Sequence, residues 1–452
     1  MLNLKSSIPE LNALLIKGEI HPMDLVNELE RTVQLYEPIV HAWVNLDIES
    51  VKSETKNKSE GILALTKRSA LAGLPVGVKD IFNTRQFPTE MGSPVWKGFT
   101  PGNNARAVDA LLDEGAIIAG KTVTAEFAVH ELNKTQNPHD ITRTPGTSSS
   151  GSAVAVATGM VPYALGTQTA GSIVRPASFC GIWGMKPSFG LIPRTGILKT
   201  TDSLDTVGFL ASHGESLFPI LDALRVKGPD YPFVYQNMDR KITEHRKKKE
   251  SWRIGFVRTH TWRGAEGYAK EAMEGFVNTL ANTKFVEMNQ IEWSGILAES
   301  HEIHKTIYNK SLSYYFQAEE KAGEQVSKIM REMIEKGKSI SPEEYKSALS
   351  AQVEIRQTLD SLLQSYDAVI SLATSSDAPV RGVQELPDPS LIWTLAQIPT
   401  VAIPMFRSPA GLPFGIQMVA KKWSDFRLLT VIEDLIERGV LPSGSQEIRN
   451  IV

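Results

Sequence analysis

The sequence has little cysteine, with Cys180 the only one among 452 residues. A single thiol excludes an internal disulfide framework and fits a reducing compartment. Cys180 lies in the run ASFCGIWG, where a small buried hydrophobe is a better interpretation than a nucleophile. The composition therefore does not describe a small secreted scaffold held by disulfides.

An excess of basic charge is also missing. The 48 lysines and arginines stand against 51 aspartates and glutamates, for a net charge of −3. Such a chain has no broad basic field, which disfavours a nucleic-acid partner. No apolar run reaches the roughly 18 residues of a membrane span. The N-terminal run MLNLKSSIPELNALL lacks the layout of a signal peptide. We expect a cytoplasmic protein without a membrane partner.

Apolar side chains are abundant, at 42% of the residues. That supply supports a large core, and α/β enzymes of this length often fold as one unit. Helical spacing or caps predict helices within 8–36, 105–115, 153–158, 265–366 and 424–438. Apolar runs or alternation predict strands within 72–82, 117–120, 191–197, 203–210, 252–257, 367–374, 391–406 and 411–420.

The segment from Pro145 to Pro187 organises the rest of the chain. It reads PGTSSSGSAVAVATGMVPYALGTQTAGSIVRPASFCGIWGMKP. A glycine- and serine-rich run is usually a flexible linker, but a linker does not lead directly into buried-looking apolar runs. Small residues in this setting indicate a closely approached backbone with hydroxyls facing a cavity. Ser148 and Ser172 are the candidate reactive hydroxyls.

Lys79 is the candidate base for those hydroxyls. The chain has no G-x-S-x-G elbow and no histidine in the serine-rich segment, which disfavours a Ser-His-Asp hydrolase. Lysine can replace histidine when its amine is neutral, and burial lowers a lysine pKa in that direction. Lys79 ends the alternating run GLPVGVK. Without further context, a surface lysine on a strand edge would be the simpler interpretation.

Three motifs together resemble the amidase signature family of serine hydrolases. They are GLPVGVKD at 73–80, GTSSSGS at 146–152 and GTQTAGSIVRPA at 166–177, and Ser148 and Ser172 stand at the family interval of 24 residues. Weaker similarity runs from about Leu11 to Arg438. The resemblance implies an α/β/α sandwich with a central mixed β-sheet flanked by helices. It implies one amidase domain over 1–452, with N-terminal helices at 1–65, the signature core at 66–225, a helical cover at about 265–366, and C-terminal strands and a helix at 367–452.

The resemblance also assigns roles. Ser172 matches the nucleophile, Ser148 the bridging serine and Lys79 the base, and the Thr147–Ser148 bond matches a cis peptide. The oxyanion hole corresponds to the backbone N–H groups of Thr169, Ala170, Gly171 and Ser172. No metal or cofactor is implied, and the resemblance is compatible with a homodimer. Thr147 and Ala170 replace family glycines, Gln168 replaces an aspartate, and TLAQIP, from Thr394, departs from the family's N-x-x-G-x-P.

Arg175 is the most informative departure, because it follows the nucleophile by three positions rather than the usual two. This arrangement resembles the malonamidase-type branch, in which the arginine holds a substrate carboxylate. A guanidinium suits such a contact. The alternative is a structural arginine paired with a buried acid. The first interpretation implies a short, carboxylate-bearing amide as substrate.

Two other motifs are misleading. GAIIAGKT at 115–122 matches the phosphate-loop pattern, but a predicted helix precedes it and the intervening residues read as a core strand, which is the reverse of the required order. We therefore expect Lys121→Ala to leave catalysis largely intact. His301 and His304, in HEIH, lack the spacing of a zinc motif, and we expect two solvated helix histidines.

We predict hydrolysis of a small carboxamide to a carboxylate and ammonia. One alternative is a glutaminase component of a transamidosome, which a copurifying partner would favour. A second is a nucleotide-binding protein, which rests on GAIIAGKT alone. A third is a catalytically silent family member, because four signature positions deviate.

Overall fold

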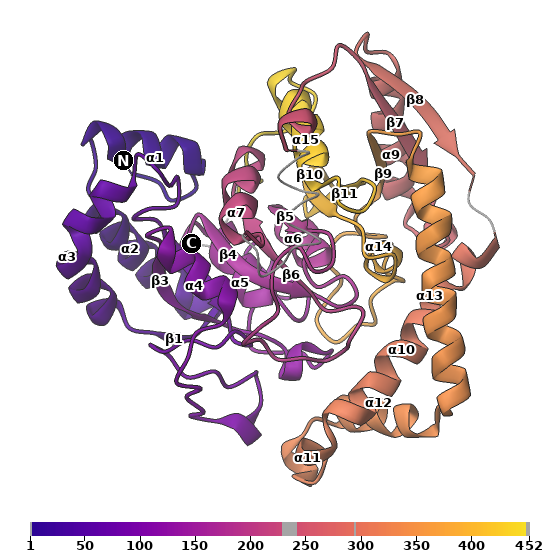
Figure 1. Ribbon diagram of the computed structural model, residues 1–452, viewed down its shortest axis with the longest axis horizontal. Helices are drawn as coiled ribbons and strands as arrows, with labels where there is room; N and C mark the ends of the chain where they lie inside the picture. The colour runs from indigo at the N-terminus through magenta and orange to yellow at the C-terminus, as the bar shows by residue number, and fades with distance from the viewer. Residues whose placement is uncertain (1, 228–241, 293–294, 449–452) are drawn as a thin grey trace.

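A single sheet of eleven strands forms the centre of the computed structural model (Figure 1). The structure describes residues 2–227, 242–292 and 295–448. The strands are β1 Trp43–Leu46, β2 Pro75–Lys79, β3 Ile117–Thr122, β4 Tyr163–Gln168, β5 Trp183–Lys186, β6 Thr206–Ala211, β7 Trp252–Val257, β8 Val286–Ile291, β9 Ala368–Leu372, β10 Thr400–Arg407 and β11 Pro413–Val419. They lie in the order β1-β3-β2-β4-β6-β5-β10-β11-β9-β7-β8. Strands from both halves of the sequence therefore share one sheet.

The sheet is mixed. Strand β2 is parallel to both β3 and β4, and β7 is parallel to β8 and β9, whereas the central pairs from β4 to β9 are antiparallel. Strands β2, β3 and β4 are buried at every position. Burial on both faces explains why their sequences are runs of apolar and small residues rather than clean alternations.

Helices flank this sheet, which confirms the predicted α/β sandwich with a central mixed sheet. They are α1 Ile8–Lys17, α2 Pro22–Val40, α3 Ile48–Leu65, α4 Arg106–Asp113, α5 Ser150–Ala157, α6 Val174–Cys180, α7 Leu217–Leu224, α9 Gly267–Ala281, α10 Ser300–Tyr315, α11 Gln317–Glu320, α12 Lys328–Ser339, α13 Pro342–Leu363, α14 Leu391–Leu395 and α15 Asp425–Glu437. Helices α10 to α13 gather at one side of the molecule, in orange at the lower right of Figure 1. We call these four helices the helical cover.

Local sequence explains where several helices begin. Helix α13 starts with a capping box, in which the Ser341 side chain accepts from the Glu344 N–H and Pro342 occupies the first turn. Helix α1 has the same arrangement between Ser7 and Glu10. These caps satisfy N–H groups that a helix leaves without internal partners. The cap at Ser341 is readable in the sequence as the run Ser-Pro-Glu-Glu.

Three sequence-based assignments are wrong. Residues 286–291 form strand β8 inside a region predicted to be helical, and 391–395 form helix α14 rather than a strand. In 191–197 the only strand-like feature is an isolated bridge from Ile197 to Phe82. Short apolar runs do not distinguish helix from strand by periodicity. Strand β8 is mostly polar because it lies at the edge of the sheet, where burial is partial.

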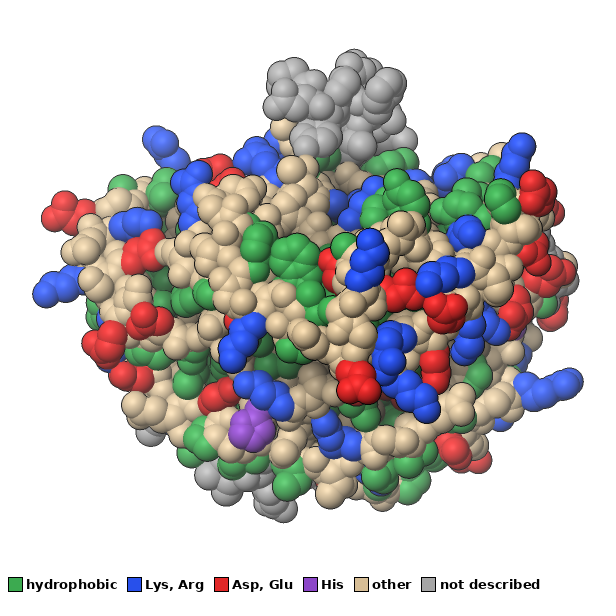
Figure 2. All heavy atoms as spheres, turned by 90° about the horizontal axis from the view of Figure 1, so that it is seen from below, with side chains coloured by type: hydrophobic (Ala, Val, Ile, Leu, Met, Phe, Trp, Pro, Cys, Tyr) green, Lys and Arg blue, Asp and Glu red, His purple; other side chains and the backbone are tan. Residues whose placement is uncertain are grey.

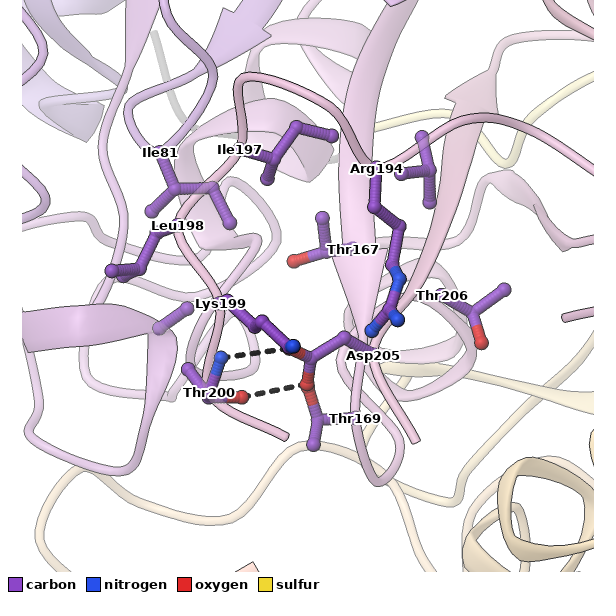
Figure 3. Close-up of a pocket in the computed structure, with 12 residues that line it drawn as sticks. Ile81, Thr167, Thr169, Arg194, Ile197, Leu198, Lys199, Thr200, Asp205 and Thr206 are labelled. Atoms are coloured by element: carbon purple, nitrogen blue, oxygen red, sulfur yellow. Dashed lines mark hydrogen bonds between the residues drawn. The ribbon is translucent and has the colours of Figure 1, made fainter. Parts of the chain in front are cut away.

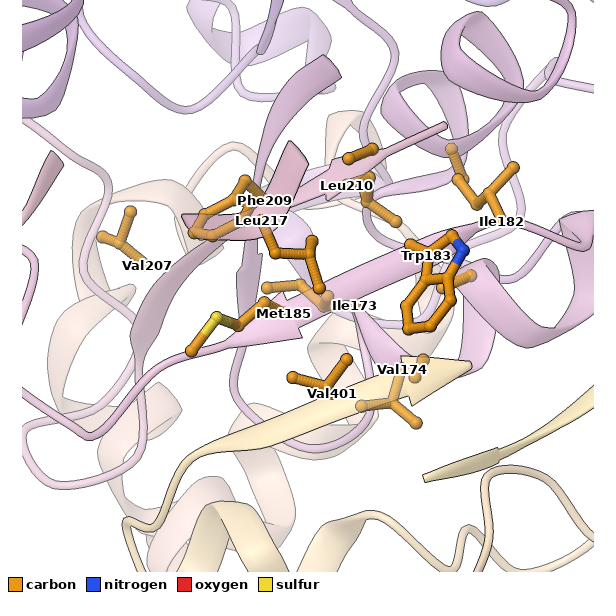
Figure 4. Close-up of a cluster of buried hydrophobic side chains, with 14 of the residues drawn as sticks. Ile173, Val174, Ile182, Trp183, Met185, Val207, Phe209, Leu210, Leu217 and Val401 are labelled. Carbon is orange, nitrogen blue, oxygen red and sulfur yellow. The ribbon is translucent and has the colours of Figure 1, made fainter. Parts of the chain in front are cut away.

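The core behind the serine-rich segment is continuous. Side chains from β5, β6 and α6 meet there with a residue of β10, and Figure 4 shows Trp183, Met185, Phe209, Ile173 and Val401 packed together. All five are at most 1% exposed. Each large buried apolar side chain contributes about 1.5–3 kcal/mol to folding. This packing gives the loop between β4 and α6 a rigid base.

The surface carries both signs of charge. Lysine and arginine side chains alternate with aspartate and glutamate over the face in Figure 2. That distribution agrees with the small net charge of the sequence. Within the described residues, none of the helices is both long and apolar enough to cross a membrane.

Candidate active site

The carboxyl ends of two neighbouring parallel strands bring the first site residues together. Strands β2 and β4 pair through Val76 with Tyr163 and Val78 with Leu165. Lys79 is the last residue of β2, and Thr167 lies near the end of β4. Parallel strands end at the same edge of a sheet, and such edges are where open α/β sheets place ligand sites.

The Lys79 amine is surrounded by hydroxyl groups. Its Nζ lies 3.0 Å from Ser148 Oγ, 3.0 Å from Ser149 Oγ and 2.9 Å from Thr167 Oγ1. The side chain is fully buried. In the described part of the chain no carboxylate forms an ion pair with it. Burial therefore lowers the Lys79 pKa well below its ordinary value, with a smaller opposing effect from Asp205.

A neutral amine has two N–H donors and one lone pair for these three hydroxyls. Ser149 Oγ lies 3.3 Å from the Thr167 carbonyl and uses its single proton there. Ser149 must then accept from Lys79. The lone pair is left for a proton from Ser148 or Thr167. The sequence predicted Ser148 as the neighbour of Lys79, and it did not single out Ser149 or Thr167.

Side chains from other parts of the chain hold the glycine- and serine-rich segment through hydrogen bonds. Thr124 donates to the Ser148 carbonyl at 2.9 Å, and Asn133 donates to the Thr147 carbonyl at 3.2 Å. Gly146 has a φ of +87°, and a Cβ there would lie 2.7 Å from Pro176 Cβ. Only glycine combines that conformation with such a close approach. The run is therefore not a linker, as its sequence context predicted.

The predicted cis bond before Ser148 is wrong. The described residues contain no cis peptide bond, so Thr147–Ser148 is trans. A non-proline cis bond costs about 3–4 kcal/mol, and Thr147 carries a side chain where the family has glycine. The Ser148 hydroxyl reaches Lys79 in the trans form.

Ser172 lies in the loop that connects β4 to α6. It is 7% exposed. Its hydroxyl makes no hydrogen bond to Ser148 within the described residues, although Lys79 and Ser148 are in contact. Catalytic hydrogen bonds are often long or open in a free enzyme and tighten when the substrate binds. The structure thus brings two of the three predicted catalytic residues into direct contact and places the third on the adjoining loop, which we call the nucleophile loop.

Two carbonyls of the nucleophile loop accept hydrogen bonds from side chains, whereas three of its N–H groups have no partner among the described residues. His304 Nε2 donates to the Thr169 carbonyl at 2.8 Å, and Thr394 donates to the Ala170 carbonyl at 2.6 Å. The N–H groups of Ala170, Gly171 and Ser172 donate to no other described residue. Free N–H groups on a fixed backbone are what an oxyanion hole requires.

The side chain of Gln168 links Thr394 to the backbone that follows the nucleophile loop. Its Nε2 donates to Thr394 at 2.9 Å, and its Oε1 accepts from the N–H groups of Ile173 and Val174 at 2.9 and 3.0 Å. In the sequence, Gln168 and Thr394 are two separate departures from the family pattern. In the structure the two side chains are hydrogen-bonded to each other, so the two departures from the family pattern meet at one contact.

Arg175 is paired with acids of a distant loop. Its Nη1 lies 2.8 Å from Glu385 Oε2 and 3.7 Å from Asp388 Oδ2. Arg175 itself is 9% exposed. Asp388 packs closely against Gly171 of the nucleophile loop. A Cβ on Gly171 would overlap the Asp388 carboxylate. This geometry fits the alternative in which Arg175 is a structural arginine paired with acids. The substrate-binding role of Arg175 stays a prediction.

Residues of the nucleophile loop line two cavities. A cavity of about 700 Å³ is lined by Thr147, Ala170, Arg175, His304 and Asp388 together with residues of the helical cover. A smaller one of about 140 Å³ is lined by Thr167, Thr169, Lys199 and Asp205 (Figure 3). In the figure Asp205 lies against Thr169 and Thr200, to which it is hydrogen-bonded. The large cavity has the room for a substrate.

The HEIH histidines are not solvated, and that expectation is wrong. His304 is 4% exposed and makes the contact with the nucleophile loop described above. His301 is half-buried and hydrogen-bonds to His260. The helix turns this face toward the loop because α10 packs onto the signature core. No group of three metal-ligating side chains includes them in the described part of the chain.

The phosphate-loop motif is part of the sheet. Its residues Ile117–Thr122 form strand β3, after helix α4, and Lys121 is fully buried. Lys121 Nζ lies 3.0 Å from Asp80 Oδ1 and donates to the Phe82 and Pro88 carbonyls and to Thr89. The predicted helix-then-strand order is confirmed, and the lysine is not available to a phosphate.

The burial of Lys121 changes the expected effect of its replacement. We expect Lys121→Ala to lower the free energy of unfolding by about 3–5 kcal/mol, because Asp80 would be left as an unpaired buried charge beside Lys79. Urea denaturation of the variant measures this. Lys58→Ala, at an exposed ion pair on α3, should change stability by no more than about 1 kcal/mol. Equal stability of wild type and Lys121→Ala would contradict the assigned contacts.

Comparison with known proteins gives the family. The chain matches the Amidase family over residues 24–429, which is most of its length. The chain belongs to the Amidase family.

Proteins similar to this chain carry names of more than one activity. A glutamyl-tRNA(Gln) amidotransferase subunit from Staphylococcus epidermidis is 27% identical, over 94% of this chain and 95% of the relative. A crystal structure of an amidase superposes with a TM-score of 0.84 and 25% identity, covering 96% of this chain and 100% of the other. The peptide amidase of Stenotrophomonas maltophilia gives a TM-score of 0.82 at 22% identity, with 99% of each chain covered. Family membership makes this chain an enzyme of the amidase type, which acts on carbon–nitrogen bonds, and the substrate varies among relatives.

Five residues of this amidase site were not predicted from the sequence. They are Ser149, Thr167, His304, Glu385 and Asp388. Ser149 could have been found, since it adjoins Ser148 in the same motif. Thr167 could also have been found, because it lies in the motif GTQTAGSIVRPA. His304, Glu385 and Asp388 show no local signal, because only the folded chain brings them to the nucleophile loop.

Proposed function

We propose that this protein hydrolyses a small carboxamide to a carboxylate and ammonia through an acyl-enzyme on Ser172. The observation that carries the proposal is the buried Lys79 amine, which contacts Ser148 and forms no ion pair with an acid among the described residues. An amine whose pKa is lowered by burial can accept a proton at neutral pH. A Ser–Lys pair is an established variant of the triad.

The proposed reaction transfers protons among Ser172, Ser148 and Lys79. Ser172 Oγ forms a bond to the amide carbon while its proton moves to Ser148, whose own proton moves to Lys79. The carbonyl oxygen becomes negative and accepts hydrogen bonds from the free N–H groups of the loop. The carbon–nitrogen bond then breaks, and the proton returns through Ser148 to the leaving nitrogen, which departs as ammonia. Water hydrolyses the acyl-Ser172 ester along the same path.

The charges in the large cavity favour a substrate without a negative charge. Arg175 already faces Glu385 and Asp388, so two carboxylates compensate one guanidinium. A substrate carboxylate would have to displace one of them. We propose a small uncharged amide, and the carboxylate-bearing, malonamidase-type substrate expected from the sequence remains the alternative.

Arg175→Gln separates these two substrates. If the main role of Arg175 is to form ion pairs with Glu385 and Asp388, its replacement should lower kcat/KM by a similar factor on malonamate and on propionamide. A carboxylate contact is worth about 1.5–3 kcal/mol. Loss of such a contact would lower kcat/KM at least roughly tenfold more on malonamate than on propionamide. That difference, measured by ammonia release, would favour the carboxylate-bearing substrate instead.

A second candidate is the ammonia-producing component of an amidotransferase. The curated relatives named as glutamyl-tRNA(Gln) amidotransferase subunits support it, at 26–28% identity. The altered GTQTAGS segment and the place of Arg175 disfavour it. Size-exclusion chromatography of the native protein tests it, since this candidate needs a second kind of chain and an independent amidase elutes as a monomer or the predicted homodimer.

The direct test of the proposal is a panel of small amides assayed for ammonia release by the purified chain. We expect turnover on at least one uncharged amide without added metal or partner. Ser172→Ala, prepared in parallel, controls for contaminating activity. Turnover that is equal in wild type and variant, or absent across the panel while a copurifying protein restores it, would overturn the proposal.

A further inference from the structure

One hydrogen bond joins the helical cover to the nucleophile loop. His304, on α10, has its Nε2 atom 2.8 Å from the carbonyl oxygen of Thr169. A carbonyl oxygen only accepts, so Nε2 must carry a hydrogen and the imidazole is the donor. The two residues are 135 positions apart in the sequence. No other part of the cover has such a link to a residue of the loop in the described structure.

The geometry of the peptide bond gives this contact a consequence for the oxyanion hole. In a trans peptide the C=O of one residue and the N–H of the next point in opposite directions across one rigid plane. Fixing the Thr169 carbonyl toward His304 therefore fixes the Ala170 N–H away from it. Thr394 does the same for the next plane, because it holds the Ala170 carbonyl and so directs the Gly171 N–H.

The surroundings of His304 keep its ring in this orientation. The side chain is 4% exposed and packs edge-on against Tyr308, one turn further along α10, with 5.6 Å between ring centroids. Burial lowers the pKa of His304 to about 4, while the bond to Thr169 opposes that shift. The imidazole is therefore neutral at neutral pH, and its single N–H is committed to Thr169.

We propose that His304 is a positioning residue for the oxyanion hole, through which the helical cover takes part in amide hydrolysis. The inference rests on the proposed function and names a further contributor to the same site. His304 holds the Thr169–Ala170 peptide so that the Ala170 N–H meets the oxyanion. His304 and Ala170 both line the large cavity.

The test replaces the donor while keeping the volume. His304→Met removes the N–H, and His304→Gln keeps an N–H donor on a side chain of similar reach. Losing one oxyanion-hole donor costs about 10²–10³ in kcat, and misdirecting one should cost roughly ten- to a hundredfold. We expect His304→Met to lose that factor in kcat with KM changed less than about threefold, and His304→Gln to recover most of it.

A matched control comes from another buried histidine. His139 has a pKa lowered to about 4 by burial, and its Nε2 lies 3.0 Å from the Cys180 carbonyl. His139→Met should lower the melting temperature without a selective loss of kcat. If His304→Met does not fold, His304→Asn decides, because its shorter side chain leaves Thr169 without a donor. Equal kcat for the Gln and Met or Asn variants would overturn the proposal.

A second readout separates this inference from the proposed function. The rate at which a fluorophosphonate labels Ser172 depends on an oxyanion hole for the P=O oxygen, and it needs no amide substrate. We expect slower labelling in His304→Met than in His304→Gln, at a temperature where both variants are folded. Labelling of Ser172 at one rate in all variants overturns the positioning role alone, whereas no labelling of the wild type at Ser172 overturns the proposed nucleophile.

Discussion

Ser172→Ala should abolish amide turnover, with kcat lowered by roughly 10⁴–10⁶ and the fold intact. In the proposed mechanism one hydroxyl carries the covalent step, and removing the nucleophile of a comparable hydrolase costs about this much. The residual rate would come from the free N–H groups of the loop and from substrate binding alone. Ammonia release by purified variant and wild type, with a melting curve for each, measures the effect.

Ser203→Ala is the matched control for that variant. Ser203 has a buried hydroxyl without a hydrogen-bond partner in the described structure. Its loss should leave both kcat and stability nearly unchanged. More than a few per cent of wild-type activity in a clean Ser172→Ala preparation would remove Ser172 from its assigned role, whatever the outcome at Ser203.

Lys79→Met should be nearly as damaging to turnover, by roughly 10³-fold or more. Methionine matches the apolar stem but cannot accept a proton. Stability should not fall much, because the buried amine of the wild type is itself disfavoured by desolvation. Lys186→Met is the control, since Lys186 is also fully buried with a pKa lowered to about 7 by desolvation, yet it contacts Pro187 and Ile398 away from the nucleophile loop.

The pH dependence of the wild type follows from the state of the same amine. In the proposed mechanism the neutral amine of Lys79 is the active form, so kcat/KM should fall as the pH drops through the folded-state pKa of Lys79. Because burial lowers that pKa well below 10.5, the acid limb should lie far below the ordinary lysine range. A limb centred at the ordinary lysine pKa would mean that the amine is charged at neutral pH, and it would contradict the role of a general base.

The three proposed catalytic residues could be named from the sequence because they lie in local motifs. Lys79, Ser148 and Ser172 belong to three short segments, and the spacing of the two serines is fixed by the strand and helix between them. Whether Lys79 was buried could not be read locally, since β2 is covered by strands and helices from distant segments. The sequence pattern of the family, rather than periodicity, favoured a buried lysine.

The residues that hold the nucleophile loop and Arg175 in place could be identified only from the tertiary structure. His304 looks like a solvated helix residue in sequence, and only the packing of α10 onto the core turns it toward Thr169. Glu385 and Asp388 lie in a proline-rich loop that gave no helical or strand signal. Gln168 and Thr394 were visible as departures, but their mutual hydrogen bond depends on the neighbouring placement of α14 and the end of β4.

The central claim is that Ser172 is a nucleophile whose proton reaches a neutral Lys79. Fluorophosphonate labelling, with the modified peptide located by mass spectrometry and the rate followed against pH, tests it most directly. We predict a single adduct on Ser172, a labelling rate that falls toward acid pH in the wild type, and a rate at least roughly a hundredfold lower in Lys79→Met. An adduct on another serine, or equal rates in Lys79→Met and wild type, would contradict it.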